Sequence, residues 1–524
     1  MTRCVVLTGY MGAGKTTVGH ALAAHLGWRF IDTDALVTEM SGRTPAELVG
    51  EGETHFRLWE RQAIATLVGQ EGLVVATGGG AVTDDEARAM LAAIGPVVLL
   101  DAPLEVLWER VRGDARRPLA RDRELFAARH AVRRLLYDRF PLAYDTRSGE
   151  PAAIAAEIAE DLTKGGATVS VALGERSYDV VVAPGLLSEL PRHVPGDPGP
   201  CLLVTDEGVP AWHVEVAVAA LRLGGWHPWL ERVPAGEASK SLSWAQRLYD
   251  ACARAGLGRH SPVVALGGGV VGDLAGFVAA TYMRGVPLVH VPTTLLAQVD
   301  AAVGGKAALN HPAAKNMVGA FHQPRAVVAD PVTLLTLSER EYRSGLAEVV
   351  KYGVLGDPAL FEALESGAEA LEGRPLPFLS HLVARCCALK ARIIAEDERE
   401  APGGPRAWLN VGHTIGHALE AVAGFERLTH GEAVAVGMVL EAEVGARMSL
   451  TEATLPERLR VLLRRLGLPT APPALDTESL FEAMRLDKKN RGAGLTAAIP
   501  TRLGEVAVWP MDDAVLRQVL RGAF

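Results

Sequence analysis

Residues 9–16 read Gly-Tyr-Met-Gly-Ala-Gly-Lys-Thr, a complete phosphate-binding loop close to the start of the chain. The preceding run 4–8 is apolar and β-branched, which predicts a buried strand, and residues 18–26 have a helical pattern. In that context the glycine N–H groups wrap phosphates, Lys15 neutralises their charge and the Thr16 hydroxyl can ligate magnesium. A chance glycine-rich turn is the alternative, but the flanking strand and helix favour nucleotide binding.

The bulk composition narrows the class of protein. A chain of 524 residues should hold roughly three domains. The hydrophobic content of 49% and charged content of 22% are typical of a soluble globular protein, and the net charge of −9 disfavours a nucleic-acid binder. The apolar start is interrupted by the glycine loop, no run is long enough to span a membrane, and the five cysteines lack metal-ligand spacing. We therefore expect a cytoplasmic protein with reduced thiols and neither nucleic-acid nor membrane partners.

Strand and helix signals alternate over the first 163 residues, which predicts a parallel sheet covered by helices. The glycines of 164–166 suit a helix stop and a linker, and the runs 168–173 and 178–182 have the pattern of a hairpin opening a new domain. Alternation resumes to Asp330, and residues 339–450 are mainly helical in pattern.

The predicted fold class is therefore α/β. It comprises a P-loop domain with a parallel sheet at 1–164, a Rossmann-like α/β domain at 165–332 and a mainly helical, metal-binding domain at 333–524. Because the linker is glycine-bearing and polar, few contacts should cross it, and the pieces 1–164 and 165–524 should fold separately.

The first third also carries candidate substrate groups. Asp32 and Asp34 follow a predicted strand, where one carboxylate can hold magnesium and the other can meet a substrate hydroxyl. Glycines 78–80 end another strand and let backbone approach a ligand. Three arginines, Arg57, Arg117 and Arg133, fit an acidic substrate, because a guanidinium pairs bidentately with a carboxylate.

This region resembles shikimate kinase over its whole length. The matching segments are 9–17, 32–34, 56–57, 77–80, 117–119 and Arg133 with Tyr137. The resemblance implies that ATP is bound by Gly12, Ala13, Gly14, Lys15, Thr16, Thr17, Arg110 and Arg117. It implies that shikimate is bound by Asp34, Arg57, Gly79, Gly80 and Arg133, with Arg134 as the alternative to Arg133. Lys15 and Arg117 would be catalytic, and Thr16 and Asp32 would hold magnesium.

The larger remainder contains a metal-ligand pattern. His413 and His417 are four residues apart and so share one helical face, His430 follows, and Glu348 lies upstream. Two histidines and one carboxylate with an open position form a catalytic zinc pattern. Any single histidine would more often be structural, but four candidates in glycine-flanked helices favour a metal site.

A glycine run at 267–272 follows a strand and precedes a helix, a weak signal for dinucleotide binding. Cations are plentiful nearby. They are Lys306, Lys315, Lys351, Lys390, Arg406 and the pair Lys488–Lys489. Metal, dinucleotide and cations together suggest redox chemistry on an anionic, phosphorylated polyol.

Residues from about 168 onward resemble 3-dehydroquinate synthase. The matching segments are 236–240, 267–273, 282–285, 292–306, 315–316, 345–353, 409–420 and 430–438. The resemblance implies a zinc or cobalt ion on Glu348, His413 and His430, and catalytic roles for Asp300, Lys351, Lys390 and His417. NAD would be bound by Asp206, Glu237, Lys240, Gly268, Gly269, Val270, Asp273, Thr293, Thr294, Lys306 and Lys315. The heptulosonate phosphate would be bound by Arg284, Lys306, Lys315, Asn316, Arg406, Asn410 and Lys489, with Lys488 as the alternative to Lys489.

The two resemblances together predict a bifunctional shikimate-pathway enzyme that uses ATP with magnesium, NAD and a zinc or cobalt ion. It would phosphorylate shikimate and convert 3-deoxy-D-arabino-heptulosonate 7-phosphate to 3-dehydroquinate. Arg284 would reach the substrate of a neighbouring subunit in a homodimer formed by the synthase part. The alternative is a nucleotide-sensing module fused to a metal-dependent polyol dehydrogenase, which would produce NADH in net amounts.

Overall fold

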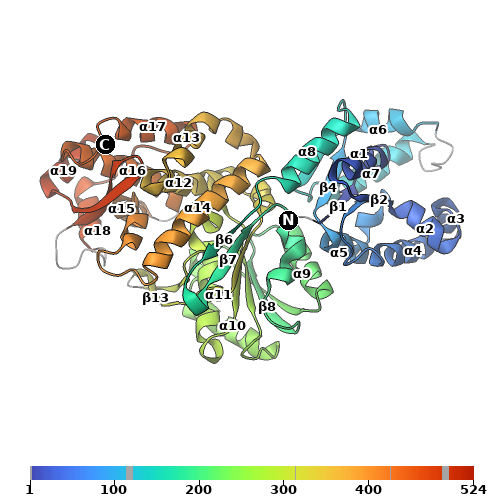
Figure 1. Cartoon of the computed structure of the whole chain (residues 1–524), viewed down its shortest axis with the longest axis horizontal. Helices are drawn as coiled ribbons and strands as arrows, with labels where there is room; N and C mark the ends of the chain where they lie inside the picture. The colour runs from blue at the N-terminus through green and yellow to red at the C-terminus, as the bar shows by residue number, and fades with distance from the viewer. Residues whose placement is uncertain (1–2, 114–121, 313, 425–426, 487–494, 524) are drawn as a thin grey trace.

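The computed structural model describes the chain except residues 1–2, 114–121, 313, 425–426, 487–494 and 524. Figure 1 shows a blue α/β body at the N-terminal end, a green α/β body in the middle and an orange-to-red helical body at the C-terminal end. This is the predicted α/β fold class. Among the described residues, no helix has both the length and the apolar character that crossing a membrane requires.

The first body is a five-stranded parallel sheet in the order β2-β3-β1-β4-β5. Its strands are β1 (Cys4–Thr8), β2 (Arg29–Asp32), β3 (Leu73–Ala76), β4 (Val97–Asp101) and β5 (Leu142–Asp145). Its helices are α1 (Lys15–Leu26), α2 (Thr33–Ser41), α3 (Pro45–Glu51), α4 (Glu53–Ala65), α5 (Asp85–Ile94), α6 (Leu104–Val111), α7 (Arg123–Tyr137) and α8 (Pro151–Thr163). β1, β3 and the first four residues of β4 are buried, as expected for a sheet covered on both faces.

The second body is a seven-stranded sheet in the order β6-β7-β14-β11-β10-β8-β9. Its strands are β6 (Ala167–Val171), β7 (Tyr178–Val182), β8 (Pro200–Asp206), β9 (His227–Val233), β10 (Val263–Gly267), β11 (Leu288–Pro292) and β14 (Ala326–Ala329). The predicted hairpin is confirmed, because β6 and β7 pair antiparallel. The hairpin β12 (Lys306–His311) and β13 (Ala314–Phe321) and the helices α9 (Ala211–Leu223), α10 (Leu242–Arg254) and α11 (Gly269–Thr281) complete it.

The third body is mainly helical, as predicted, and also holds a two-stranded hairpin that the sequence pattern did not reveal. The helices are α12 (Glu339–Gly356), α13 (Pro358–Gly367), α14 (Leu376–Glu396), α15 (His413–Ala423), α16 (His430–Arg447), α17 (Leu455–Arg465), α18 (Thr477–Leu486) and α19 (Asp513–Ala523). The strands are β15 (Thr496–Arg502) and β16 (Glu505–Pro510). α16 packs against both α12 and α15, which brings the functional residues of the three helices to one place.

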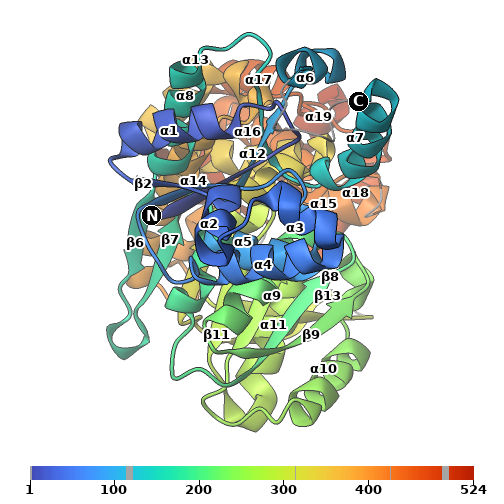
Figure 2. The same ribbon diagram turned by 90° about the vertical axis from the view of Figure 1, so that its right-hand side faces the viewer.

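The expectation that few contacts cross the first linker is wrong. α5 packs against α9, and one continuous apolar core joins Leu91 of the first body to Leu187 and Trp212 of the second. The Phe140 ring meets the Trp212 ring edge-on, with 4.7 Å between centroids. Figure 2 shows α5 directly beside α9. The composition of a linker says nothing about the surfaces of the bodies that it joins. The residues at 164–166 therefore could not predict this interface.

Candidate active sites

The phosphate-binding loop lies between β1 and α1, as predicted. Gly12 and Gly14 have φ of +86° and +89°, a backbone conformation that favours glycine. The Nζ of Lys15 donates to the carbonyls of Gly9 and Tyr10 at 2.9 and 3.1 Å. The ammonium group is thus held against the loop, where it can reach a bound phosphate.

Oxygen ligands gather beside this loop. The Thr16 hydroxyl donates to Asp32 Oδ2 at 3.2 Å. Asp32 also caps α2 by accepting the Asp34 N–H at 3.0 Å, so its carboxylate is fixed at the end of β2. A hydroxyl and a carboxylate side by side suit magnesium, which prefers oxygen ligands.

The predicted acid-binding arginines converge on the glycine loop after β3. A Cβ placed on Gly80 would lie 2.3 Å from Arg57 Nη2 and 3.1 Å from Arg133 Nη2, so both guanidinium groups lie directly against Gly80. One placed on Gly78 would lie 2.6 Å from Asp34 Oδ1. The structure therefore brings Asp34, Arg57 and Arg133 together around residues 78–80.

Arg133 and Arg134 point to different partners. Arg133 Nη1 donates to the Gly79 carbonyl at 2.7 Å, and its guanidinium lies 5.5 Å from the centre of the Tyr10 ring. Arg134 instead forms ion pairs with Asp101 and Asp138, away from the glycine loop. The arrangement favours Arg133 as the acid-binding residue.

Arg110 and Arg117 are the two remaining arginines predicted to bind ATP. Arg110 lies beside the loop, where Nη1 donates to the Gly12 carbonyl at 3.1 Å. Arg117 lies outside the described residues. The sequence reasoning missed Glu60, a side chain 1% exposed that pairs with Arg57. Burial raises the pKa of Glu60 to about 7, although Arg57 opposes the shift. Its position three residues after Arg57 on a helix could have indicated this pair.

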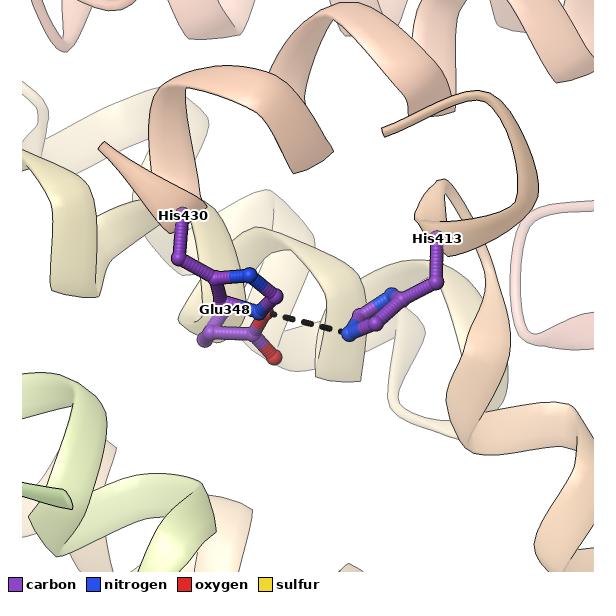
Figure 3. A group of neighbouring side chains, drawn as sticks. All are labelled: Glu348, His413 and His430. Carbon is purple, nitrogen blue, oxygen red and sulfur yellow. Dashed lines mark ion pairs between the residues drawn. The ribbon is translucent and has the colours of Figure 1, made fainter. Parts of the chain in front are cut away.

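The predicted metal ligands meet in the helical body (Figure 3). Glu348 comes from α12, and His413 and His430 are the first residues of α15 and α16. Glu348 Oε1 lies 3.7 Å from His413 Nε2 and 3.5 Å from His430 Nε2. Both Glu348 oxygens are buried, and Oε2 also pairs with Lys351 Nζ. A buried carboxylate with two imidazole nitrogens around it fits a divalent cation.

Neighbouring groups orient both histidines. His413 Nδ1 lies 3.0 Å from the Val411 carbonyl, and His430 Nδ1 lies 3.2 Å from Glu420 Oε2. These contacts leave each Nε2 facing Glu348, the usual arrangement for a metal-binding histidine. Glu420 was missed by the sequence reasoning, although it lies three residues after His417 on the same helical face. His417, Glu420 and His430 also form a second cluster able to hold a cation.

Electrostatics keeps the carboxylate of the metal site ionised. Burial alone would raise the pKa of Glu348, but Lys351 and the two histidines outweigh it and lower that pKa to about 2. Burial alone would lower the pKa of His430, whereas hydrogen bonds and charge from Glu348 and Glu420 raise it to about 10. Without a metal ion, these two carboxylates therefore favour the protonated form of His430.

Asp300 lies between the two predicted catalytic lysines, Lys351 and Lys390. Its Oδ1 lies 2.9 Å from Lys390 Nζ and 3.6 Å from Lys351 Nζ, and it accepts a hydrogen bond from the Tyr352 hydroxyl at 2.6 Å. Lys351 also pairs with Glu348, so it links this cluster to the metal site. Burial lowers the pKa of Lys390, although Asp300 opposes the shift. Tyr352 was not predicted, although it directly follows Lys351.

The predicted NAD groups lie at the carboxyl ends of the parallel strands. Gly269 begins α11 after β10, with Gly268 as its N-cap, and a Cβ placed on Gly268 would lie 3.1 Å from Thr294 Cγ2. Lys240 Nζ lies 2.7 Å from Asp273 Oδ2 and 2.5 Å from Asn316 Oδ1. The remaining groups at this edge are Asp206, Glu237, Val270 and Thr293. Such an edge of a doubly wound sheet is where dinucleotides bind.

The other predicted substrate residues are spread around this centre. Lys306 Nζ pairs with Glu400 at 2.6 Å, and Lys315 Nζ lies 3.9 Å from Glu420. Arg406 donates to the Gly304 carbonyl at 3.0 Å, and Asn410 donates to the Ala407 carbonyl at 3.1 Å. Arg284 is exposed in the turn after α11. Lys488 and Lys489 lie outside the described part of the chain.

Family models match three stretches of the chain. Shikimate kinase matches residues 11–163, the N-terminal part of 3-dehydroquinate synthase matches 231–344, and its C-terminal part matches 345–490. A relative named 3-dehydroquinate synthase, from Halorhodospira halophila, is 48% identical over 64% of this chain and 94% of its own.

Two solved structures of other synthases are similar to the larger part of the chain. A 2-deoxy-scyllo-inosose synthase with carbaglucose-6-phosphate, NAD+ and Co2+ is 28% identical, covers 68% of this chain and all of its own, and has a TM-score of 0.62. ValA, a 2-epi-5-epi-valiolone synthase from Streptomyces hygroscopicus with NAD+ and Zn2+, is 29% identical over 67% of this chain and 98% of its own, also with a TM-score of 0.62.

Proposed function

The chain belongs to the 3-dehydroquinate synthase family and carries a shikimate kinase domain at its N-terminal end, and we propose that the two sites described above carry out its two reactions. It is thus a bifunctional shikimate-pathway enzyme. One site phosphorylates shikimate with ATP. The other converts 3-deoxy-D-arabino-heptulosonate 7-phosphate to 3-dehydroquinate and phosphate. The observation that carries the second assignment is the buried triad of Glu348, His413 and His430 beside the Asp300 cluster.

In the kinase site, each group has a role set by its position. Lys15 neutralises charge on the transferred phosphoryl group, together with Arg117, and Arg110 holds the nucleotide. Arg57 and Arg133 bind the shikimate carboxylate, while Asp34 orients a substrate hydroxyl. The support is their convergence on residues 78–80. Magnesium, held by Thr16 and Asp32, supplies charge neutralisation when bound.

In the synthase site, Glu348, His413 and His430 would hold the divalent metal, and the sheet edge with Gly268, Gly269 and Asp273 would hold NAD. When bound, the metal would polarise a substrate hydroxyl, and NAD would accept a hydride and return it. The two known structures with NAD+ and Co2+ or Zn2+ support this assignment.

The protein's own side chains do the remaining work of the synthase. Asp300, Lys351 and Lys390 form a connected, mostly buried network that can hold or pass a proton at the substrate. His417 shares a helical face with His413 and is not part of the first metal triad, which leaves it for proton transfer or substrate contact. Lys306, Lys315, Asn316, Arg406, Asn410 and Lys489 supply polar contacts for an anionic, phosphorylated substrate.

The organisation of the chain is also part of the proposal. We assign the kinase to 1–164, the NAD-binding part to 165–332 and the helical part to 333–524. The synthase part forms a homodimer in which Arg284 reaches the neighbouring subunit's substrate, and its exposure supports that role. The enzyme acts in the cytoplasm.

One assay separates this function from the dehydrogenase alternative. The purified chain is given the heptulosonate phosphate with NAD, and phosphate release and nicotinamide absorbance are followed together. We expect phosphate release without accumulation of NADH, because the hydride is returned in each turnover. A rise in NADH proportional to product would support the dehydrogenase. Shikimate-dependent ADP formation, measured separately, tests the kinase and excludes a purely sensing module.

A further inference from the structure

Glu215 in α9, on the synthase side, forms ion pairs with two arginines of the kinase. Its Oε1 accepts from Arg139 Nη2 at 2.8 Å, and its Oε2 accepts from Arg88 Nε at 3.4 Å. The Glu215 side chain is 35% exposed and Arg88 is 12% exposed, so the pair with Arg88 is partly shielded from water. One carboxylate thus joins two kinase segments that are about fifty residues apart in sequence.

Both segments hold the glycine loop of the acid-binding site. Arg88 Nη1 donates to the Val82 carbonyl at 3.0 Å, and Val82 lies in the short helix that directly follows Gly80. Arg139 lies two residues after the end of α7, the helix that reaches the loop from its other side. The Tyr137 hydroxyl on that helix donates to the Gly79 carbonyl at 2.9 Å.

Apolar packing keeps Glu215 in place relative to the kinase. Trp212 and Val216 flank it on α9 and belong to the core shared by both bodies. The Trp212 ring meets Phe140, the neighbour of Arg139, and α9 packs along α5, which carries Arg88. The carboxylate is therefore carried by a helix that packs directly against the kinase, and Figure 2 shows this helix, α9, beside α5.

We propose that Glu215 is a positioning residue by which the synthase part sets the geometry of the shikimate-binding loop of the kinase. It does not touch the substrate. It fixes Arg88 and Arg139, and through them the short helix after Gly80 and the end of α7. This inference rests on the proposed binding of the shikimate carboxylate at Arg57 and Arg133.

The test uses the full chain with Glu215→Gln, which keeps the shape of the side chain and removes its charge. Because the ion pairs are partly exposed, we expect a rise of about three- to tenfold in the shikimate KM, with the ATP KM and synthase activity unchanged. Arg139→Gln removes one of the same pairs from the kinase side and should give a rise of the same kind.

Glu71→Gln is the matched control. Glu71 pairs with Arg192 of the synthase part at 2.8 Å, so it also joins the two bodies, but it precedes β3 at the end of the sheet opposite to residues 78–80. Its shikimate KM should stay at the wild-type value. An equal rise in this control would overturn the proposal, because the effect would then come from docking in general.

An unchanged shikimate KM in Glu215→Gln would also overturn the proposal. If Glu215→Gln does not fold, the shikimate KM of Arg139→Gln is measured instead, and an unchanged value would overturn the proposal. Absence of shikimate phosphorylation in the wild-type chain is a different result, because it contradicts the kinase function itself.

Discussion

The two catalytic centres of this chain handle charge in different ways. In the synthase, Lys351 and Glu348 are 1% and 0% exposed, and the Lys351 ammonium balances the carboxylates of both Glu348 and Asp300. In the kinase, Lys15 and Arg133 are partly exposed and donate to backbone carbonyls, and only Arg57 of the predicted clamp pairs with a buried carboxylate, that of Glu60. A buried charge that loses its partner is costly, whereas a partly exposed one regains water. Folding and function should therefore be coupled in the synthase centre and largely separable at Lys15 and Arg133 of the kinase centre.

The largest expected effect is that of His430→Ala. The variant leaves only Glu348 and His413 in the first triad, so the metal should be lost and synthase activity should fall by about a thousandfold or more. Kinase activity should persist. Elemental analysis of the purified protein and the two separate assays measure this. His227→Ala, at an exposed histidine, serves as the control and should keep its metal. Full metal content in His430→Ala would show that His430 is not a ligand.

Removing a buried cation tests the coupling directly. Lys351→Met leaves Glu348 and Asp300 without their shared partner and should lower the free energy of unfolding of the synthase part by about 3–5 kcal/mol in the metal-free protein. Chemical denaturation in the presence of a chelator measures this loss. Lys164→Met breaks an exposed ion pair with Glu160 and should cost less than about 1 kcal/mol. Equal losses in the two variants would contradict the contrast between the centres.

Much of both centres was predictable from the sequence, because parallel βα units place their loops at one edge of a sheet. The phosphate loop and the glycines at 78–80 and 267–269 follow this rule. The triad ligands lie on three helices instead, and they were predicted from the resemblance to 3-dehydroquinate synthase. The partners of those residues were not predictable in the same way. Tyr352 on Asp300 and Glu215 on Arg139 join distant segments, and their pairing is decided by packing that no local pattern encodes.

Acid should weaken the region where the two bodies meet. Burial lowers the pKa of His213 in α9 to about 4, so this histidine is neutral in the folded protein and charged in the unfolded chain below pH 6.5. Neutral His213 therefore contributes up to about 3 kcal/mol to the free energy of unfolding above pH 6.5. This contribution is lost as the pH falls toward 4. Denaturation at pH 7 and pH 4.5 should show a smaller loss for His213→Gln than for the wild type. An identical loss would mean that other groups determine the acid response.

The smallest effect on folding is expected in the kinase centre. Arg133→Ala removes a partly exposed guanidinium whose bond partner, the Gly79 carbonyl, also accepts from Tyr137, so the free energy of unfolding should change by less than about 1 kcal/mol. The shikimate KM should nevertheless rise about 10- to 100-fold with little change in the ATP KM, because one half of a charge-assisted carboxylate clamp is lost. Arg134→Ala is the control, since its guanidinium pairs with Asp101 and Asp138 instead. A rise in shikimate KM with Arg134→Ala alone would reassign the clamp. A large loss of stability with Arg133→Ala would instead show that the kinase centre, like the synthase centre, uses its catalytic charges to hold the fold together.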